Sequence, residues 1–184
     1  MTKTAIGAGL LVAGLGLALG CSTMKISTDY DPKGQYAQYH TFQMAGGTPA
    51  PNALAQERID AALITALQGK GLKKVESGGD LKVYTHVRMS VEKHIDYDSF
   101  GYAGYGYHGY GYAWSAGPSS ATVREYPVGT LVIDLVDGKD KKLVWRGTAS
   151  DYVDQNPTPE KSSAKAKEAM DRLFATFPPG TTTK

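Results

Sequence analysis

A long alternation of apolar and polar side chains places the strongest constraint on how this chain can fold. Over residues 81–96, apolar side chains occupy alternate positions for most of the segment, and polar side chains fill the positions between them. The apolar members are Leu81, Val83, Val87, Met89, Val91 and Ile95. A period of two sends successive side chains to opposite faces of a strand. The segment is therefore predicted to be a half-buried antiparallel strand.

Four more strands are predicted from runs of β-branched and aromatic residues that are bounded by turn residues. They cover residues 25–31, 39–44, 122–136 and 142–152. The sequence Asp-Pro-Lys-Gly at 31–34 is a strong turn signal between the first two. The sequence Asp-Gly-Lys-Asp at 137–140 joins the last two, which we expect to form a hairpin.

Two amphipathic helices are predicted from capping residues and helical spacing of apolar residues. Asn52 can cap a helix that ends at Gly69. Thr158 can cap a second helix with Pro159 at its first position, and Phe-Pro-Pro-Gly at 177–180 ends it. The predicted fold class is α+β, with an antiparallel sheet of about five strands and both helices packed on one face, after an N-terminal signal peptide.

The first twenty residues predict export. Lys3 precedes an apolar run over residues 5–19 that contains four glycines. A membrane-spanning helix needs roughly 20 apolar residues, so this shorter and glycine-rich run suits a signal peptide better. We therefore expect residues 1–20 to be removed from the mature chain.

Cys21 is the only cysteine and stands directly after that run, so an intrachain disulfide is impossible. Residues 18–22, Ala-Leu-Gly-Cys-Ser, resemble the bacterial lipobox. The resemblance implies lipidation of Cys21 with palmitate-type acyl chains. Ser22 after the cysteine implies delivery to the outer membrane of a Gram-negative cell, with the domain facing the periplasm. An ordinary signal peptide with an unpaired cysteine and an uncleaved anchor are the alternatives.

The length of 184 residues suits one domain rather than two. We expect a lipidated tether at 21–25, a single α+β domain at 26–179 and a short tail at 180–184. The 20 Lys and Arg residues nearly balance 18 Asp and Glu residues, for a net charge of +2. Such a chain has no broad positive field, so nucleic acid is not an expected partner.

Residues 97–118 form a low-complexity insert rich in glycine and tyrosine. Six of the chain's twelve tyrosines and six glycines lie there. Aromatic rings on such a loop can stack on sugars, lie at a lipid interface or self-associate. A tolerated insertion at a hairpin tip is the alternative. The candidate ligand-contact residues are Tyr102, Tyr105, Tyr107, Tyr110, Tyr112 and Trp114.

The insert contains a match to the dinucleotide-binding pattern G-x-G-x-x-G at Gly104, Gly106 and Gly109. That motif acts only where a strand turns into a helix whose N-terminus meets the pyrophosphate, and no helical spacing follows here. The sequence also lacks the G-x-S-x-G and H-E-x-x-H patterns of hydrolases. We predict no catalytic residues, no cofactor and no enzyme activity.

A metal site is conceivable on one face of the long strand. Glu92, His94, Asp96 and Asp98 follow one another at every second position, and His108 could reach back from the insert. The polar face of an amphipathic strand explains the same pattern without a ligand. We favour that explanation and predict no metal.

The chain resembles the bacterial lipoprotein family of domain of unknown function 4136, over about residues 26–179. The resemblance rests on Asp29-Tyr30-Asp31, Tyr39-His40-Thr41-Phe42, Lys70-Gly71-Leu72, Asp80-Leu81-Lys82-Val83, the segment from Leu143 to Ala149, and Phe177-Pro178-Pro179. It implies an envelope lipoprotein and supplies no catalytic residues. We interpret Trp145 as a ring packed on the sheet and Arg146 as a guanidinium held by carbonyls or carboxylates.

Together these features predict a noncatalytic lipoprotein, attached to a membrane through its lipid anchor, with a structural or protein-interaction role. Its partner would be another envelope protein, met through the polar sheet face or the aromatic insert. The alternative is a module that binds glycan or lipopolysaccharide through the Tyr- and Trp-rich loop.

Overall fold

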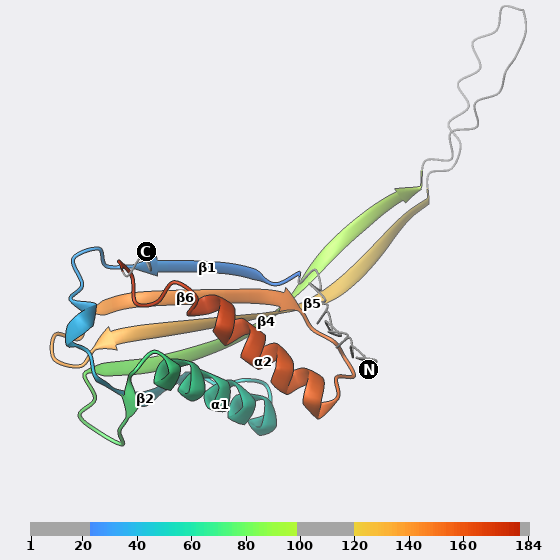
Figure 1. Cartoon of the computed structure of the whole chain (residues 1–184). Coiled ribbons are helices and arrows are strands. Elements are labelled where there is room, and N and C mark those ends of the chain that lie inside the picture. Colours follow the sequence, from blue (N-terminus) through green and yellow to red (C-terminus); the bar gives the residue numbers. More distant parts are fainter. Residues whose placement is uncertain (1–22, 99–119, 181–184) are drawn as a thin grey trace, which may run out of the picture.

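A six-stranded sheet with two helices on one face makes up the domain (Figure 1). It is seen in a computed structural model that describes residues 23–98 and 120–180. The predicted α+β class is confirmed. The elements in chain order are β1 (Lys25–Tyr30), the 3₁₀ turn η1 (Tyr36–Gln38), β2 (Thr41–Thr48), α1 (Ala53–Gly69), β3 (Lys73–Lys74), β4 (Leu81–Asp98), β5 (Ser120–Asp137), β6 (Leu143–Tyr152) and α2 (Pro159–Leu173).

The strand order is β1-β6-β5-β4-β2-β3, and the sheet is mixed rather than fully antiparallel. β2 runs parallel to β4, because α1 carries the chain back along the sheet before β4 begins. The two-residue strand β3 adds a sixth member and also runs parallel to β2. The turn after β1 does not make a hairpin, since β1 pairs with β6 while β2 lies beyond β4.

Both helices begin at the predicted caps. The Asn52 side chain accepts a hydrogen bond from the Ala55 backbone N–H at 2.8 Å, and Thr158 accepts one from the Lys161 backbone N–H at 3.3 Å. α2 ends at Leu173, earlier than the predicted stop, although the turn that follows still buries its aromatic rings. No helix in the described ranges, 23–98 and 120–180, is long and apolar enough to span a membrane.

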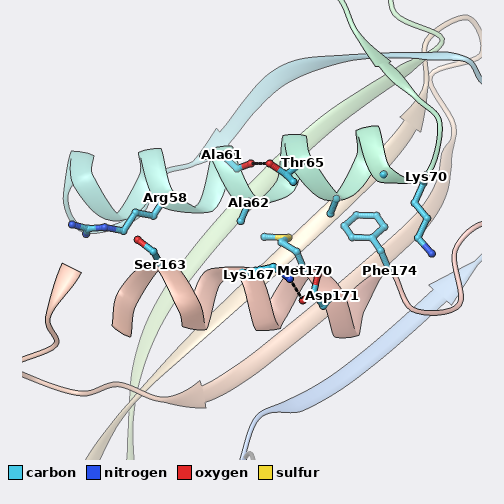
Figure 2. A pocket seen from close by; sticks show the side chains of 12 residues that line it. Arg58, Ala61, Ala62, Thr65, Lys70, Ser163, Lys167, Met170, Asp171 and Phe174 are labelled. Atoms are coloured by element: carbon cyan, nitrogen blue, oxygen red, sulfur yellow. Dashed lines mark hydrogen bonds and ion pairs between the residues drawn. The ribbon is translucent and has the colours of Figure 1, made fainter. Parts of the chain in front are cut away.

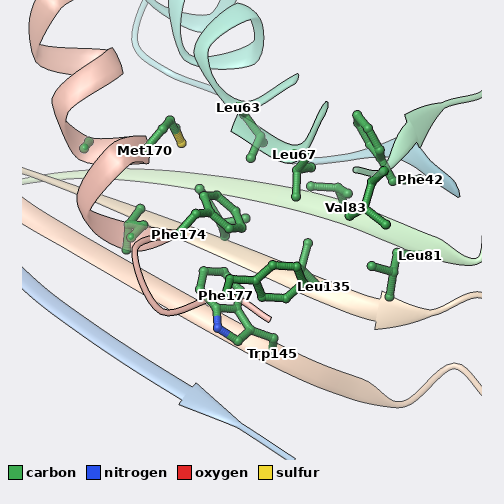
Figure 3. Packing of buried hydrophobic residues seen from close by; sticks show 14 of the residues in the cluster. Phe42, Leu63, Leu67, Leu81, Val83, Leu135, Trp145, Met170, Phe174 and Phe177 are labelled. Carbon is green, nitrogen blue, oxygen red and sulfur yellow. The ribbon is translucent and has the colours of Figure 1, made fainter. Parts of the chain in front are cut away.

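The core lies between the sheet and the helices, and an aromatic cluster forms one end of it (Figure 3). Trp145 is 2% exposed and stacks on Phe174 with ring centroids 4.8 Å apart, while Phe177 meets both rings edge-on. Gly147 lies beneath the indole, where an added Cβ would be 2.4 Å from Cη2 of Trp145. The interpretation of Trp145 as a ring packed on the sheet is confirmed.

β4 and β5 continue far beyond their neighbours. They pair from Leu81 with Asp137 to Asp98 with Ser120, whereas β2 stops pairing with β4 at His86. On the other side, β6 stops pairing with β5 at Val128. The outer parts, residues 91–98 and 120–127, therefore project from the body as a two-stranded ribbon (Figure 1). We call this segment the ribbon and the rest of the domain the body.

Candidate interaction site at the foot of the ribbon

A groove of about 860 Å³ lies where the ribbon leaves the body. Its walls come from the N-terminal half of α1, with Ala55 and Ile59, and from α2, with Ala166 and Ala169. Its floor is the helix-facing side of the sheet. The apolar floor residues are Val87, Met89, Pro127, Leu131 and Ala149. Its volume lies within the range of small-molecule sites, and its lining is largely apolar.

The charged groups at the groove's edge are largely held by the chain itself. Lys165 Nζ lies 2.9 Å from the Asp151 carboxylate and also donates to the Tyr152 carbonyl at 2.6 Å. The other oxygen of the Asp151 carboxylate accepts a hydrogen bond from the Thr23 hydroxyl at 2.6 Å. These bonds fix the entry of the chain into the domain at the groove's edge. Met24, the next residue, lines the groove.

An apolar row continues from the groove along the ribbon. Met89, Val91 and Ile95 on β4 and Val123 on β5 are 48–57% exposed. These residues occupy the face that is buried under the helices in the body, because side chains along β4 alternate between faces. An ion pair between Lys93 and Glu125, at 2.9 Å, interrupts the row. Four exposed apolar side chains on one face of a projecting ribbon make this row a candidate interaction surface.

The opposite face of β4 is polar, as the alternation predicts. Arg146 donates from Nε and Nη2 to the two carboxylate oxygens of Asp134, each at 2.6 Å. These hydrogen bonds, together with the charge of Asp134, raise the pKa of the Arg146 guanidinium. The interpretation of Arg146 as held by a carboxylate is confirmed. Further along this face, the His94 and Tyr126 rings meet edge-on at 5.6 Å.

A smaller hollow of about 580 Å³ lies between α1 and α2, which run side by side in the same direction (Figure 2). Several of its polar groups bond within their own helices. The Thr65 hydroxyl donates to the Ala61 carbonyl at 2.8 Å, and Lys167 pairs with Asp171 at 2.5 Å. These groups are already engaged, and the rest of the lining is mainly apolar apart from Arg58 and Lys70.

Asp80, which begins one of the motifs of the family resemblance, and Asp137, in the turn at 137–140, both hold loops in place. Asp80 Oδ2 accepts hydrogen bonds from the His40 and Thr41 backbone N–H groups, both at 3.0 Å. The hydrogen bond from His40 is the main reason why the pKa of Asp80 is lowered. Asp137 accepts bonds from the Asp140 backbone N–H at 2.9 Å and from the Tyr39 hydroxyl at 2.9 Å. Burial raises the pKa of that Tyr39 hydroxyl to about 12.

The pattern considered for a metal does not form a ligand cluster within the described residues. His94 Nε2 lies 4.0 Å from the Glu92 carboxylate, and both side chains are about half exposed. No group of three His, Cys, Asp or Glu in the part of the chain that the structure describes is placed to hold a metal ion. The side chains of Asp96 and Asp98, and His108, lie outside that part.

The residues predicted to contact a membrane or ligand also lie outside the described ranges. They are Cys21, Tyr102, Tyr105, Tyr107, Tyr110, Tyr112 and Trp114. Their roles stay predictions. The groove and the projecting ribbon were not predicted, because they depend on where β2 and β6 stop pairing with longer neighbours. The unusual length of the alternation over residues 81–96 was the one sequence signal that indicated a strand longer than its neighbours.

The fold and its surfaces define an α+β domain in which a projecting ribbon and an apolar groove, rather than a cluster of reactive side chains, stand out. The chain belongs to the family described as Domain of unknown function (DUF4136), which it matches over residues 26–179. The predicted family is confirmed. The comparison with curated proteins found no significant match.

Solved structures that are similar to this chain share little of its sequence. A PDZ domain protein from Parabacteroides distasonis is 16% identical, with a TM-score of 0.53, and the match covers 85% of this chain but only 36% of that protein. A PelC dodecamer from Paraburkholderia phytofirmans is 10% identical, with a TM-score of 0.50 and coverages of 83% and 96%. Lipoprotein GNA1162 from Neisseria meningitidis is 12% identical, with a TM-score of 0.41 and coverages of 74% and 99%. At these identities the likeness concerns the fold alone.

Proposed function

We propose that this chain is a noncatalytic envelope lipoprotein of a Gram-negative bacterium, with a structural or protein-interaction role at the outer membrane. The observation that carries the proposal is the short separation along the sequence, two residues, between Cys21 and Thr23, the first residue that the structure describes. Thr23 is bonded to Asp151, and Met24 is 5% exposed, with its carbonyl oxygen accepting a hydrogen bond from Arg172 at 2.8 Å. The body is therefore ordered from two positions after the cysteine.

That short connection determines which part of the domain would lie near a bilayer. Two residues span at most about 7 Å, so acyl chains on Cys21 would hold Thr23 close to the membrane surface. Several acyl chains give a stable anchor, because each buried methylene contributes about 0.8 kcal/mol. The groove lies beside Thr23 and Met24, so the anchored end of the body would also be the end that carries the groove.

An interaction role is supported by the surfaces at this end. The groove and the apolar row on the ribbon expose aliphatic side chains that water solvates poorly. In the described ranges, the buried carboxylates Asp134 and Asp137 are held by Arg146, Tyr39 and backbone N–H groups. Such groups support the fold and leave the exposed surfaces for binding.

Replacing the sulfur tests the lipoprotein proposal. We expect Cys21→Ser to leave the membrane fraction and to lack the added mass of acyl chains in intact-protein mass spectrometry. Ser22→Asp is the matched control, because it keeps the sulfur. It is expected to stay acylated and membrane-bound while moving from the outer to the inner membrane. If Cys21→Ser stays as membrane-bound as the unmodified sequence, with no change in mass, the proposal is wrong.

A further inference from the structure

The free edge of β4 along the ribbon carries backbone groups that point away from β5. The Pro127 carbonyl oxygen accepts a hydrogen bond from Val153 at 2.9 Å, so it points to the β6 side. Pro127 has no N–H, and it is paired with Val91 in the β4–β5 register. This pair therefore makes no hydrogen bonds across the ladder, and the N–H and C=O of Val91 point to the outer edge.

Hydrogen-bonded and non-hydrogen-bonded pairs alternate along an antiparallel ladder, so every second residue of β4 has the backbone orientation of Val91. Met89, Lys93 and Ile95 share the orientation of Val91, so their backbone groups also point outward from the ribbon. Within the described ranges, β2 covers this edge only as far as His86. The result is an open edge of about eleven residues without a proline or glycine. Natural edge strands are usually short, covered or interrupted, so an edge like this is suited to pairing.

The two edges of the ribbon differ in how well they are protected. On β5, the imino nitrogen of Pro127 faces the outer edge, so this edge lacks a donor at that point. On β4, every residue from Val87 to Asp98 keeps its N–H. A two-stranded ribbon is also only marginally stable in water unless further strands or a helix support it. The marginal stability gives a reason for another strand to add, and the missing donor at Pro127 selects the β4 edge as the place.

We propose that the partner at this edge is a second copy of the chain, whose β4 pairs antiparallel with the first, with Lys93 facing Lys93 on the two-fold axis. This register pairs positions 88–98 of one copy with positions 98–88 of the other. It forms a four-stranded sheet in the order β5-β4-β4-β5. The interface is isologous, since each copy contributes the same surface.

Charge and side-chain complementarity select this register. It places Glu92 of each copy opposite His94 of the other, and Val91 opposite Ile95, and each of these pairs occurs twice by symmetry. Cross-strand pairs of opposite polarity or of aliphatic residues stabilise a sheet. The lysines on the axis are each paired with Glu125 of their own copy at 2.9 Å. A shift of the axis to position 92 would instead place two Glu92 side chains face to face.

A lipid surface is a poorer occupant of the same edge. The outward N–H and C=O groups of β4 would lose water in hydrocarbon without gaining a partner. The Lys93 and Glu125 ion pair lies in the middle of the apolar row and would also have to enter the lipid. A second strand satisfies the backbone groups and leaves the ion pair at the surface of the sheet.

Single cysteines test the proposal in intact cells that express the full chain. Cys21 is present in every variant, and its sulfur cannot form a disulfide where it carries an acyl chain. The unmodified chain, oxidised in parallel, measures any crosslink through a free Cys21 thiol, and this background is subtracted from the result for each variant. Lys93→Cys places two thiols on the axis, where paired strands have Cα atoms about 5.5 Å apart, which suits a disulfide. Mild oxidation is expected to shift most of this variant to a band of twice the mass on a non-reducing gel.

Glu125→Cys is the matched control, because Glu125 is paired with Lys93, faces the same side and is similarly exposed. In the proposed sheet its two copies lie three strand spacings apart, about 14 Å, too far for a disulfide. Equal crosslinking of the two variants, or a Lys93→Cys product with the mass of another protein, would overturn the proposal.

A charge exchange in the Lys93→Cys background tests the register. Glu92→His alone places imidazoles opposite each other and is expected to reduce the crosslinked fraction. Adding His94→Glu restores the opposed pair and is expected to restore the crosslink. If the double exchange crosslinks no better than the single change, the register centred on Lys93 is wrong.

Discussion

The body and the ribbon share the strands β4 and β5, yet the apolar side chains of β4 are buried in the body and exposed in the ribbon. In the body, Leu81 and Val83 of β4 are fully buried beneath the helices. In the ribbon, Val91 and Ile95 lie on the same strand and the same face, and they are 57% and 51% exposed. A regular alternation therefore determines which face of a strand is apolar. What covers that face depends on elements elsewhere in the chain.

The difference has an energetic consequence. Full burial of an aliphatic side chain contributes about 1.5–3 kcal/mol, and residues in the body receive most of this contribution. In the ribbon the same residue types contribute little to the folded monomer. The apolar row is then best explained by binding rather than by stability.

The largest expected contrast comes from replacing one aromatic side chain in the body and one aliphatic side chain in the ribbon by alanine. Trp145→Ala removes the ring that stacks on Phe174, and we expect it to lower the free energy of unfolding by about 3–5 kcal/mol. Ile95→Ala is expected to lower it by less than about 0.5 kcal/mol. Urea unfolding followed by circular dichroism measures both. Similar losses in the two variants would show that the ribbon is part of the cooperative core.

The body was largely predictable from local patterns, whereas its strand order was not. Asn52 and Thr158 begin their helices where capping chemistry predicts, because a cap is formed by residues close in sequence. The parallel pairing of β2 with β4 depends on how α1 crosses the sheet, which no local pattern contains. The free edge of β4 is harder still to predict, since it exists only because β2 ends at Thr48.

A second contrast between the body and the ribbon is how strongly stability depends on pH under acidic conditions. In the body, the pKa of Asp137 is lowered, first by the hydrogen bond from the Asp140 backbone N–H and further by Tyr39 and Lys139. A carboxyl whose pKa is lower in the folded state stabilises the protein fully above its ordinary value of 3.8, and this contribution is lost as the pH falls through the lowered pKa. Asp137→Asn is expected to cost about 1–2 kcal/mol at pH 7.

The measurement for Asp137→Asn is the dependence of unfolding free energy on pH. Below about pH 4 the variant should lose stability less steeply than the unmodified protein, because one linked proton has been removed. Glu125→Gln in the ribbon is the control, and its curve is expected to follow that of the unmodified protein. If the free energy of unfolding falls with the same slope below about pH 4 in Asp137→Asn and in the unmodified protein, protonation of Asp137 is not linked to unfolding.

The smallest expected contrast lies between two ion pairs on β-strands. Arg146 and Asp134 form a two-pronged pair on the body, where the Asp134 side chain is only 11% exposed. Lys93 and Glu125 form a single pair on the ribbon, where both side chains are more than half exposed. A double-mutant cycle to alanine should give a coupling of about 1 kcal/mol for the body pair, reduced by the exposure of Arg146.

For the ribbon pair, the same cycle should give no coupling that is measurable in unfolding experiments at physiological salt, because water and ions screen exposed charges. Repeating both cycles in 1 M salt sharpens the comparison, since the body pair should keep part of its coupling. A larger coupling in the ribbon than in the body would mean that the ribbon pair is shielded from water.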